Sequence, residues 1–492
     1  MSTRDSLVAL GGAAIGAGAL LLAQKSFDKD SFFGSGPSLV RKLSFKTPPC
    51  IVIIDPLSTG MTLASLLQSK GYAVIRVYSQ EFPEEITNLV PKTLSKPVMW
   101  HSTISHSGDV EATLKKIMLV KGVHVENFMV GCESGVELTD QLTNLWVRKY
   151  AGKNCPITTN GVAMSRARRD KYHMGEAVRA AGLRAVQQEL FGEGKIEEVK
   201  RFVEGCKDEE GNFRVVLKPV ASAGSEGVYF ASNQQEVEGY YGDIINSTNV
   251  FGHLNTSVLV QEFLSGKEYV VDSVSVEGVH KTVAIWEYDK RPTNGAQFVY
   301  YGMRLYESSD GSREQKLVEY MHGVLESLQV KNGPSHGEVM WTSTGPCLIE
   351  VGSRPHGGEG TFVTLADGCI GYNQLGVMVD AHENRSKFFK LPGRPQKLAA
   401  HATEVCLINY QEGTLLDYPG MEEVKSLPSF VEAEMKMHIG EHFPVTVDFL
   451  TSPGAIMLMH ESKEVMERDA ERIHELCKEG LFSVRRLRSG TL

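Results

Sequence analysis

Two lysines and two carboxylates are the residues of this chain that could do chemistry together. Lys171 lies near a predicted helix, and Lys218 ends a predicted strand just before Pro219. Two lysines that converge from separate elements could hold a polyphosphate as point charges. Either lysine alone is more typical of a solvated surface position, so the inference depends on their combination with the features that follow.

The segment after Lys218, from Ala221 to Gly227, consists almost entirely of small residues. Small residues let backbone N–H groups approach phosphate oxygens closely. The segment is not a P-loop, because GxxxxGK[ST] is absent. On its own it would be an ordinary connection between two strands.

Glu338 and Glu350 lie in two apolar strands that a short turn joins into a predicted hairpin. Two carboxylates side by side repel each other unless a cation lies between them. Magnesium prefers carboxylate and phosphate oxygens, so the pair predicts a Mg²⁺–nucleotide site. A solvated strand face is the alternative for either residue alone.

In this order along the chain, the residues resemble the ATP-grasp superfamily over about residues 47–480. Three stretches, at 131–138, 165–171 and 345–360, resemble its amino-acid ligase branch. The resemblance implies ATP and Mg²⁺ as cofactors and the following roles. Lys171 and Lys218 contact ATP phosphates, Ser225 and Gly227 belong to the phosphate loop, Glu262, Phe263 and Leu264 cradle adenine, Glu268 takes the ribose hydroxyls, Glu338 and Glu350 hold Mg²⁺, and Arg354 binds the substrate carboxylate or the acyl phosphate.

Three details of this site stay open at the sequence level. Gly352 stands where many family members have Asn, which leaves the number of Mg²⁺ ions undecided. His336 could donate to a developing oxyanion or could be a buried structural histidine. Glu287 could pair with a substrate ammonium or could be a plain exposed strand residue.

The HxxEH string at 438–442 resembles a zinc-peptidase motif, but Gly440 interrupts any helix, so zinc is not expected.

The elements that must position these residues begin at Cys50. Strand–helix–strand alternation predicts a parallel sheet, with Val98–His101 among its strands and a basic helix at Ser165–Ala181. The fold class is α/β, with α+β in the core. We expect a Rossmann-like N-terminal pre-ATP-grasp domain at 45–155, an ATP-grasp core of two subdomains at 156–388, and a C-terminal α+β lid at 389–492.

Residues 1–44 form an apolar leader and linker. Seventeen apolar or glycine residues, 7–23, reach the lower limit for spanning a bilayer. Three interpretations stay open: the segment is an uncleaved membrane anchor, it is a targeting segment that is removed, or it is neither. The localisation stays open as well. The net charge of −9 gives no basic excess for nucleic acid. The eight scattered cysteines predict reduced thiols.

The predicted function is an ATP- and Mg²⁺-dependent ligase that joins a carboxylate to an amine through an acyl phosphate, with amino acids as substrates. The family resemblance also suggests a homodimer. One alternative is an ATP-grasp enzyme that activates bicarbonate, although no Ala-Met-Lys-Met biotin site occurs. Another is a membrane-tethered regulator that binds ATP without turnover.

Overall fold

The computed structural model describes residues 47–486, apart from 84–86, 88–90, 92–93, 95, 151–156, 208–209, 221–226, 250–251, 253 and 308–310. Ser225 and the predicted anchor at 7–23 lie outside the described residues. In the part of the chain that is described, no helix combines the length and apolar character needed to cross a membrane. The cysteines in the described part are all free thiols.

Four parallel strands form the N-terminal sheet, in the order β3-β2-β1-β4. Both faces are covered: one packs on α1, the other on α3 and α4. Burial on both faces explains the continuous apolar run of the first strand. The elements are β1 (Pro49–Ile54), α1 (Thr59–Ser69), β2 (Ala73–Tyr78), β3 (Ser102–Ser105), α3 (Val110–Met118), β4 (His124–Val130), η1 (Glu133–Gly135) and α4 (Val136–Tyr150). The predicted strand at Val98–His101 is wrong, because pairing with β2 begins only at Ser102.

An antiparallel sheet in the order β5-β8-β6-β7 carries Lys218 at the end of one strand. Its elements are β5 (Gln188–Gly192), α6 (Ile196–Glu204), β6 (Val215–Lys218), β7 (Tyr229–Ala231), α7 (Gln234–Ile244) and β8 (Ser257–Glu262). The predicted helix at Ser165–Ala181 is shorter than expected. Turns occupy 163–169, and α5 (Lys171–Ala180) begins only after Asp170, whose carboxylate caps it.

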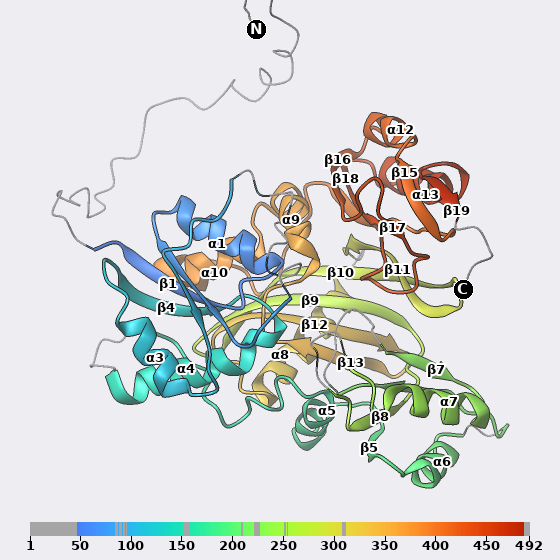
Figure 1. Cartoon of the computed structure of the whole chain (residues 1–492), viewed down its shortest axis with the longest axis horizontal. Helices are drawn as coiled ribbons and strands as arrows, with labels where there is room; N and C mark the ends of the chain where they lie inside the picture. Colours follow the sequence, from blue (N-terminus) through green and yellow to red (C-terminus); the bar gives the residue numbers. More distant parts are fainter. Residues whose placement is uncertain are drawn as a thin grey trace, which may run out of the picture. The chain divides into compact units, whose positions relative to one another are not determined.

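The largest sheet is antiparallel, with the order β13-β12-β9-β10-β11-β14-β18-β16. Alternate residues of β9 face opposite sides, as the pleat requires. Val270 and Val274 pack with α9 and α10, whereas Tyr269 and Val271 pack with α8. Figure 1 shows its long strands in yellow-green and tan. The elements are β9 (Lys267–Val276), β10 (Val279–Thr293), β11 (Ala296–Leu305), α8 (Ser312–Ser327), β12 (Gly333–Thr342), β13 (Gly345–Gly352), η2 (Gly358–Gly360), α9 (Phe362–Ile370), α10 (Gln374–Glu383) and α11 (Arg385–Lys390).

The C-terminal part continues this same sheet. β14 pairs with β11, and β18 and β16 follow, so the sheet runs through the boundary predicted at 388/389. A small sheet, β17-β15-β19, and two helices complete this part. The elements are β14 (His401–Cys406), β15 (Gly413–Asp417), α12 (Met421–Ser426), β16 (Phe430–Met435), β17 (His442–Phe443), β18 (Gly454–His460), α13 (Lys463–Glu479) and β19 (Ser483–Arg486). The HxxEH string forms a turn and the start of β17, not a helix.

Candidate active site

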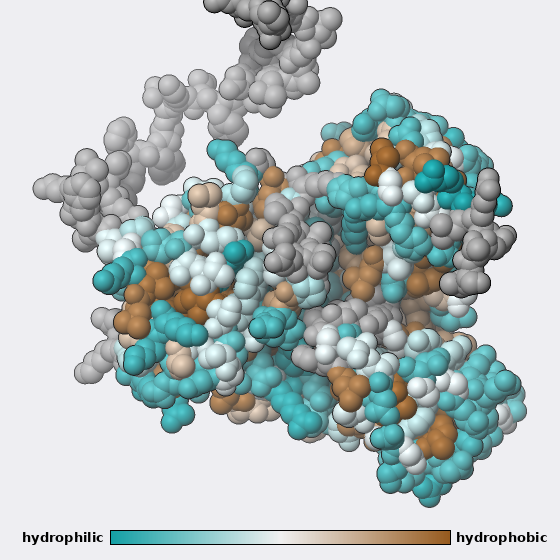
Figure 2. Space-filling model, in the orientation of Figure 1, coloured by the Kyte–Doolittle hydropathy of each residue, from teal (hydrophilic) through white to brown (hydrophobic). Residues whose placement is uncertain are grey.

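A cavity of about 730 Å³ receives side chains from the β5-β8-β6-β7 sheet, from the largest sheet and from the loops after β1, β4 and β13. A recess is visible near the middle of the molecular face in Figure 2. Nearly all the predicted site residues within the described part line this cavity. The lining members are Lys171, Lys218, Glu262, Phe263, Leu264, Glu268, His336, Glu338, Glu350 and Arg354.

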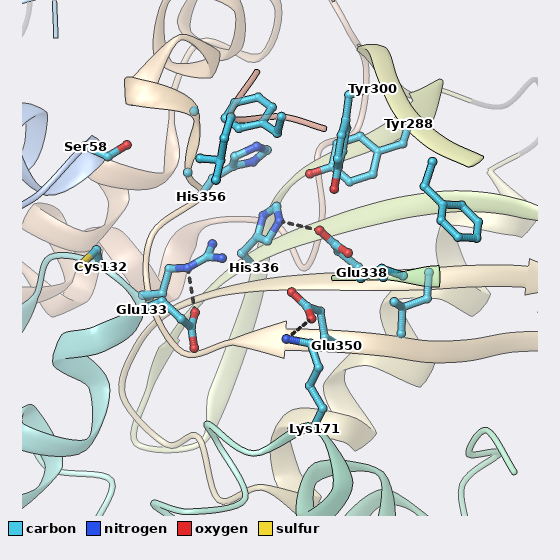
Figure 3. Close-up of a pocket in the computed structure, with 18 of the residues that line it drawn as sticks. Ser58, Cys132, Glu133, Lys171, Tyr288, Tyr300, His336, Glu338, Glu350 and His356 are labelled. Carbon is cyan, nitrogen blue, oxygen red and sulfur yellow. Dashed lines mark hydrogen bonds and ion pairs between the residues drawn. The ribbon is translucent and has the colours of Figure 1, made fainter. Parts of the chain in front are cut away.

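Glu338 and Glu350 face each other across the β12–β13 hairpin, as the sequence predicts (Figure 3). Glu338 is buried, and Nε2 of His336 lies 3.6 Å from its Oε1. Burial alone would raise the pKa of Glu338, but the charges of Lys290 and His336 hold it at about 2. This carboxylate therefore stays ionised at any working pH, as a cation ligand must.

Lys171 and Lys218 converge on the carboxylate hairpin from two different elements. Lys171 is the first residue of α5, and its Nζ lies 2.7 Å from Oε2 of Glu350. Lys218 is buried at the end of β6. Burial and the neighbouring Lys171 lower the pKa of Lys218 to about 8, because nearby Glu350 and Glu338 only partly offset them. Two close cations and two close carboxylates form an arrangement suited to a metal-bound polyphosphate.

The predicted adenine-binding segment follows β8. The backbone N–H of Phe263 donates to the carbonyl of Arg214 at 3.0 Å, and its ring packs edge-on against Phe230. Oε1 of Glu262 accepts a hydrogen bond from the backbone of Gln187 at 2.9 Å. Phe263 and Leu264 line the cavity with apolar surface, which would suit a flat base.

Gly227 ends the predicted phosphate loop with a φ of +65°. A side chain there would be strained, and its Cβ would lie 3.1 Å from the ring of Pro219. The backbone conformation and the nearby Pro219 ring therefore both favour glycine at this position.

Glu268, predicted to take ribose hydroxyls, already has a cationic partner. Nζ of Lys290 lies 2.5 Å from its Oε1, and both side chains are largely buried. Lys290 also lies over the rings of Tyr288 and Tyr300, at 4.9 and 4.4 Å from their centroids. Sequence reasoning missed Lys290. Because Lys290 contacts Oε1 of Glu268, only the second carboxylate oxygen is left for the predicted ribose hydroxyls.

Arg354 is held by the carboxylate of Glu133 in η1, just after β4 of the N-terminal sheet. Its Nε donates to Oε2 of Glu133 at 2.9 Å, and Arg169 donates to Oε1 of the same carboxylate at 2.7 Å. A Cβ added at Gly352 would lie 2.6 Å from Oε2 of Glu133 and 3.0 Å from Nε of Arg354. The missing side chain at 352 thus has a steric cause, because the Glu133–Arg354 ion pair occupies that space.

Glu287 fits neither of the two interpretations that its sequence allowed. It is buried rather than exposed, and its Oε1 accepts from Nη2 of Arg304 at 3.0 Å and lies 3.7 Å from Nζ of Lys267. It lines a second cleft beside α13 rather than the main cavity. Its neighbour Tyr288 faces the main cavity instead, because successive strand residues alternate in direction.

Residues 211–362 match a family model described as an ATP-grasp domain. The chain contains an ATP-grasp domain. It is 28% identical over 434 residues to dapdiamide A synthase of Enterobacter agglomerans, covering 87% of this chain and 95% of that protein. The predicted family resemblance is therefore confirmed.

Solved structures share the ATP-grasp fold over most of the chain. An L-amino acid ligase from Bacillus licheniformis superposes with a TM-score of 0.66 at 16% identity, covering 90% of this chain and 100% of the other. N5-carboxyaminoimidazole synthetase from Staphylococcus aureus, solved with ADP, gives 0.58 at 16% identity, covering 87% and 98%. The fold class predicted from the sequence is confirmed.

One buried carboxylate beside this cavity was not predicted at all. Asp272 accepts hydrogen bonds from His336, His356 and the indole of Trp286, at 2.9, 2.7 and 2.9 Å. Its signal in the sequence was a single acidic residue within the apolar strand YVVDSVSV. A fully buried charge needs partners, so such a residue marks a site where others converge. Glu133 gave no comparable signal.

Proposed function

We propose that this chain is an ATP- and Mg²⁺-dependent ligase that joins the carboxylate of one amino acid to an amine through an acyl phosphate. The observation that carries the proposal is the convergence of Glu338, Glu350, Lys171, Lys218 and Arg354 on one cavity. The dapdiamide A synthase relative and the L-amino acid ligase neighbour support amino acids as substrates.

The carboxylate hairpin fits Mg²⁺ by the chemistry of its donors. Glu338 and Glu350 are opposite residues of an antiparallel pair, and oxygen ligands from one or two carboxylates plus phosphates are what this ion prefers. A bound Mg²⁺ would be held by Glu338 and Glu350 and would neutralise phosphate charge. Lys171, now paired with Glu350, would then turn toward a phosphate oxygen.

The cationic residues give the first half-reaction its electrostatics. In that step the substrate carboxylate attacks the γ-phosphorus of ATP, and ADP leaves with the electron pair of the broken P–O bond. Lys171 and Lys218 would stabilise charge on the phosphates. The planar guanidinium of Arg354, fixed by Glu133, would orient the substrate carboxylate. Positioning and charge neutralisation supply most of the catalysis in phosphoryl transfer.

ADP release from Mg²⁺-ATP, measured across pairs of amino acids, tests this proposal. We expect release that requires two amino acids and disappears in Glu350→Gln. Release with bicarbonate alone would favour the bicarbonate-activating alternative. Tight ATP binding without release for any pair would favour the regulator without turnover and contradict the ligase for those substrates.

Membrane attachment through residues 7–23 and a homodimer stay predictions. Membrane fractionation of the full chain tests the first, against a variant lacking 7–23. Light scattering of the purified protein tests the second.

A further inference from the structure

Asp272 holds two histidines in fixed orientations at the edge of the main cavity. Its Oδ1 accepts from Nδ1 of His336 at 2.9 Å, and its Oδ2 accepts from Nδ1 of His356 at 2.7 Å. All three side chains are buried, and both imidazoles line the cavity (Figure 3). A carboxylate on Nδ1 fixes the tautomer, so in each neutral ring the proton is on Nδ1 and the lone pair on Nε2.

The three residues form a hydrogen-bonded group rather than a metal site. Their ligand atoms all lie within 4.8 Å of one another. A metal bound to imidazole nitrogen would sit at about 2.0–2.1 Å from that atom and would need its lone pair. Here each Nδ1 instead lies at hydrogen-bond distance from its own carboxylate oxygen, and Trp286 donates to Oδ2 as well.

The two Nε2 atoms have different surroundings. Nε2 of His336 lies 3.6 Å from Oε1 of Glu338, on the side of the carboxylate hairpin. His356 lies on the loop after Arg354, stacked on Phe362 with its ring 4.7 Å away. Among the described residues, Nε2 of His356 has no hydrogen-bond partner. Its lone pair is therefore available to accept a hydrogen bond from a substrate.

The charges around His356 favour its neutral form. Burial lowers its pKa, the neighbouring His336 and Arg354 lower it further, and Asp272 offsets them only in part. Burial alone would raise the pKa of Asp272, but the two histidines hold it well below its usual range, so Asp272 stays ionised. The groups facing His356 are thus Asp272 on β9, His336 on β12 and Arg354 on its own segment.

We propose that Nε2 of His356, oriented by Asp272, is the base that takes the proton from the attacking amine. This inference rests on the proposed ligase function. An amino acid arrives as an ammonium, which has no lone pair for attack. Once His356 takes one proton, the nitrogen forms a bond to the acyl carbon. The bond from that carbon to the phosphate oxygen breaks, and the phosphate leaves with the electron pair and the second proton.

Hydroxylamine separates deprotonation of the amine from the earlier formation of the acyl phosphate. It is a free base at neutral pH, so it traps the acyl phosphate without needing a protein base. The test compares amide and hydroxamate formation in His356→Asn. The Asn amide can still donate to Asp272 in place of Nδ1, but it has no Nε2. We expect amide formation to fall about 10²-fold or more, with hydroxamate formation and ATP affinity within about two-fold of the unmodified protein.

Two further variants control this test. His356→Gln replaces Nε2 rather than Nδ1 and should impair both reactions, because it loses the contact with Asp272. His280→Gln removes a buried histidine that bonds Ser275 outside the cavity, and should impair neither reaction. Thermal melting checks that each variant is folded.

The pH profile gives a second readout. In His356→Asn the rate of amide formation should rise in proportion to the unprotonated amine, up to the pKa of the amine itself. Equal loss of amide and hydroxamate in His356→Asn, or an unchanged pH profile, would overturn the role of His356. If the unmodified protein forms no hydroxamate that requires the carboxylic acid substrate, the ligase proposal itself fails.

Discussion

At the scale of single residues, the proposed role of Lys218 would link ATP binding to pH. Its pKa is about 8 in the protein without nucleotide, because it is buried beside Lys171. Below pH 8 the Lys218 ammonium is charged and, under the proposed function, would bind phosphate; above pH 8 the free protein holds a neutral amine. A bound polyphosphate would raise this pKa. We therefore expect ATP affinity to fall as pH rises through about 8, and ATP binding just above that pH to take up a proton.

Calorimetry in two buffers of different ionisation enthalpy measures that proton uptake. Lys218→Gln should bind ATP more weakly at neutral pH and should lose the uptake. Uptake of the same size in Lys218→Gln would assign it to another group.

Gly352 is a residue whose lack of a side chain protects an ion pair. In Gly352→Asn the new Cβ would meet Oε2 of Glu133 at 2.6 Å, so the Glu133–Arg354 pair must move. We expect the KM for the acid substrate to rise about ten-fold or more, with ATP affinity changed much less. Gly239→Asn is the control, because a Cβ on that residue of α7 meets nothing within 4 Å. An unchanged KM in Gly352→Asn would show that Arg354 does not hold the acid.

At the scale of elements, the cap of α5 positions Lys171. Oδ1 of Asp170 accepts from the backbone N–H groups of Tyr172 and His173, at 3.0 and 3.1 Å. Asp170→Ala should lower the free energy of unfolding by about 1 kcal/mol. It should also raise the KM for ATP, because the first turn carries the lysine.

Asp109→Ala separates stability from positioning. Asp109 caps α3 in the same way, with bonds from Glu111 and Ala112 at 2.8 and 3.1 Å, but lies outside the cavity lining. Chemical denaturation and ATP kinetics of both variants check the prediction. An equal effect of the two variants on the KM for ATP would mean that Asp170 acts only through stability.

The elements that could be predicted from the sequence are those whose secondary structure is determined by their own residues. The hairpin of Glu338 and Glu350 follows from two apolar runs around a short turn, and local residues suffice to place it. The run at Val98–His101 is apolar, yet Met99 is 76% exposed there, and the strand forms only where residues meet β2. His336, which bonds Asp272, and Glu133, which bonds Arg354, lie 64 and 221 positions away from them, so no local pattern shows these contacts.

At the scale of the whole molecule, the same limit applies to domain boundaries. Two prolines after Lys390 indicated a break in the chain, and the chain does leave its helix there. The sheet nevertheless continues, because β14 pairs with β11 through Thr403, Glu404 and Val405. Strand pairing between distant segments determines where such a boundary lies, and the local composition of the chain does not indicate that pairing.

The continuous sheet predicts that the C-terminal part is needed for folding. Removing residues 391–492 would leave β11 without its β14 partner and would take Ala402, Ala455 and Met457 out of the main hydrophobic cluster. It would also remove Glu404 and Cys406 from the cavity wall. We expect the truncated chain to lack a cooperative thermal transition and to bind no ATP. Removal of residues 487–492 alone should leave both intact. A cooperative melt and ATP binding by the shorter chain would instead establish 389–492 as an independent lid.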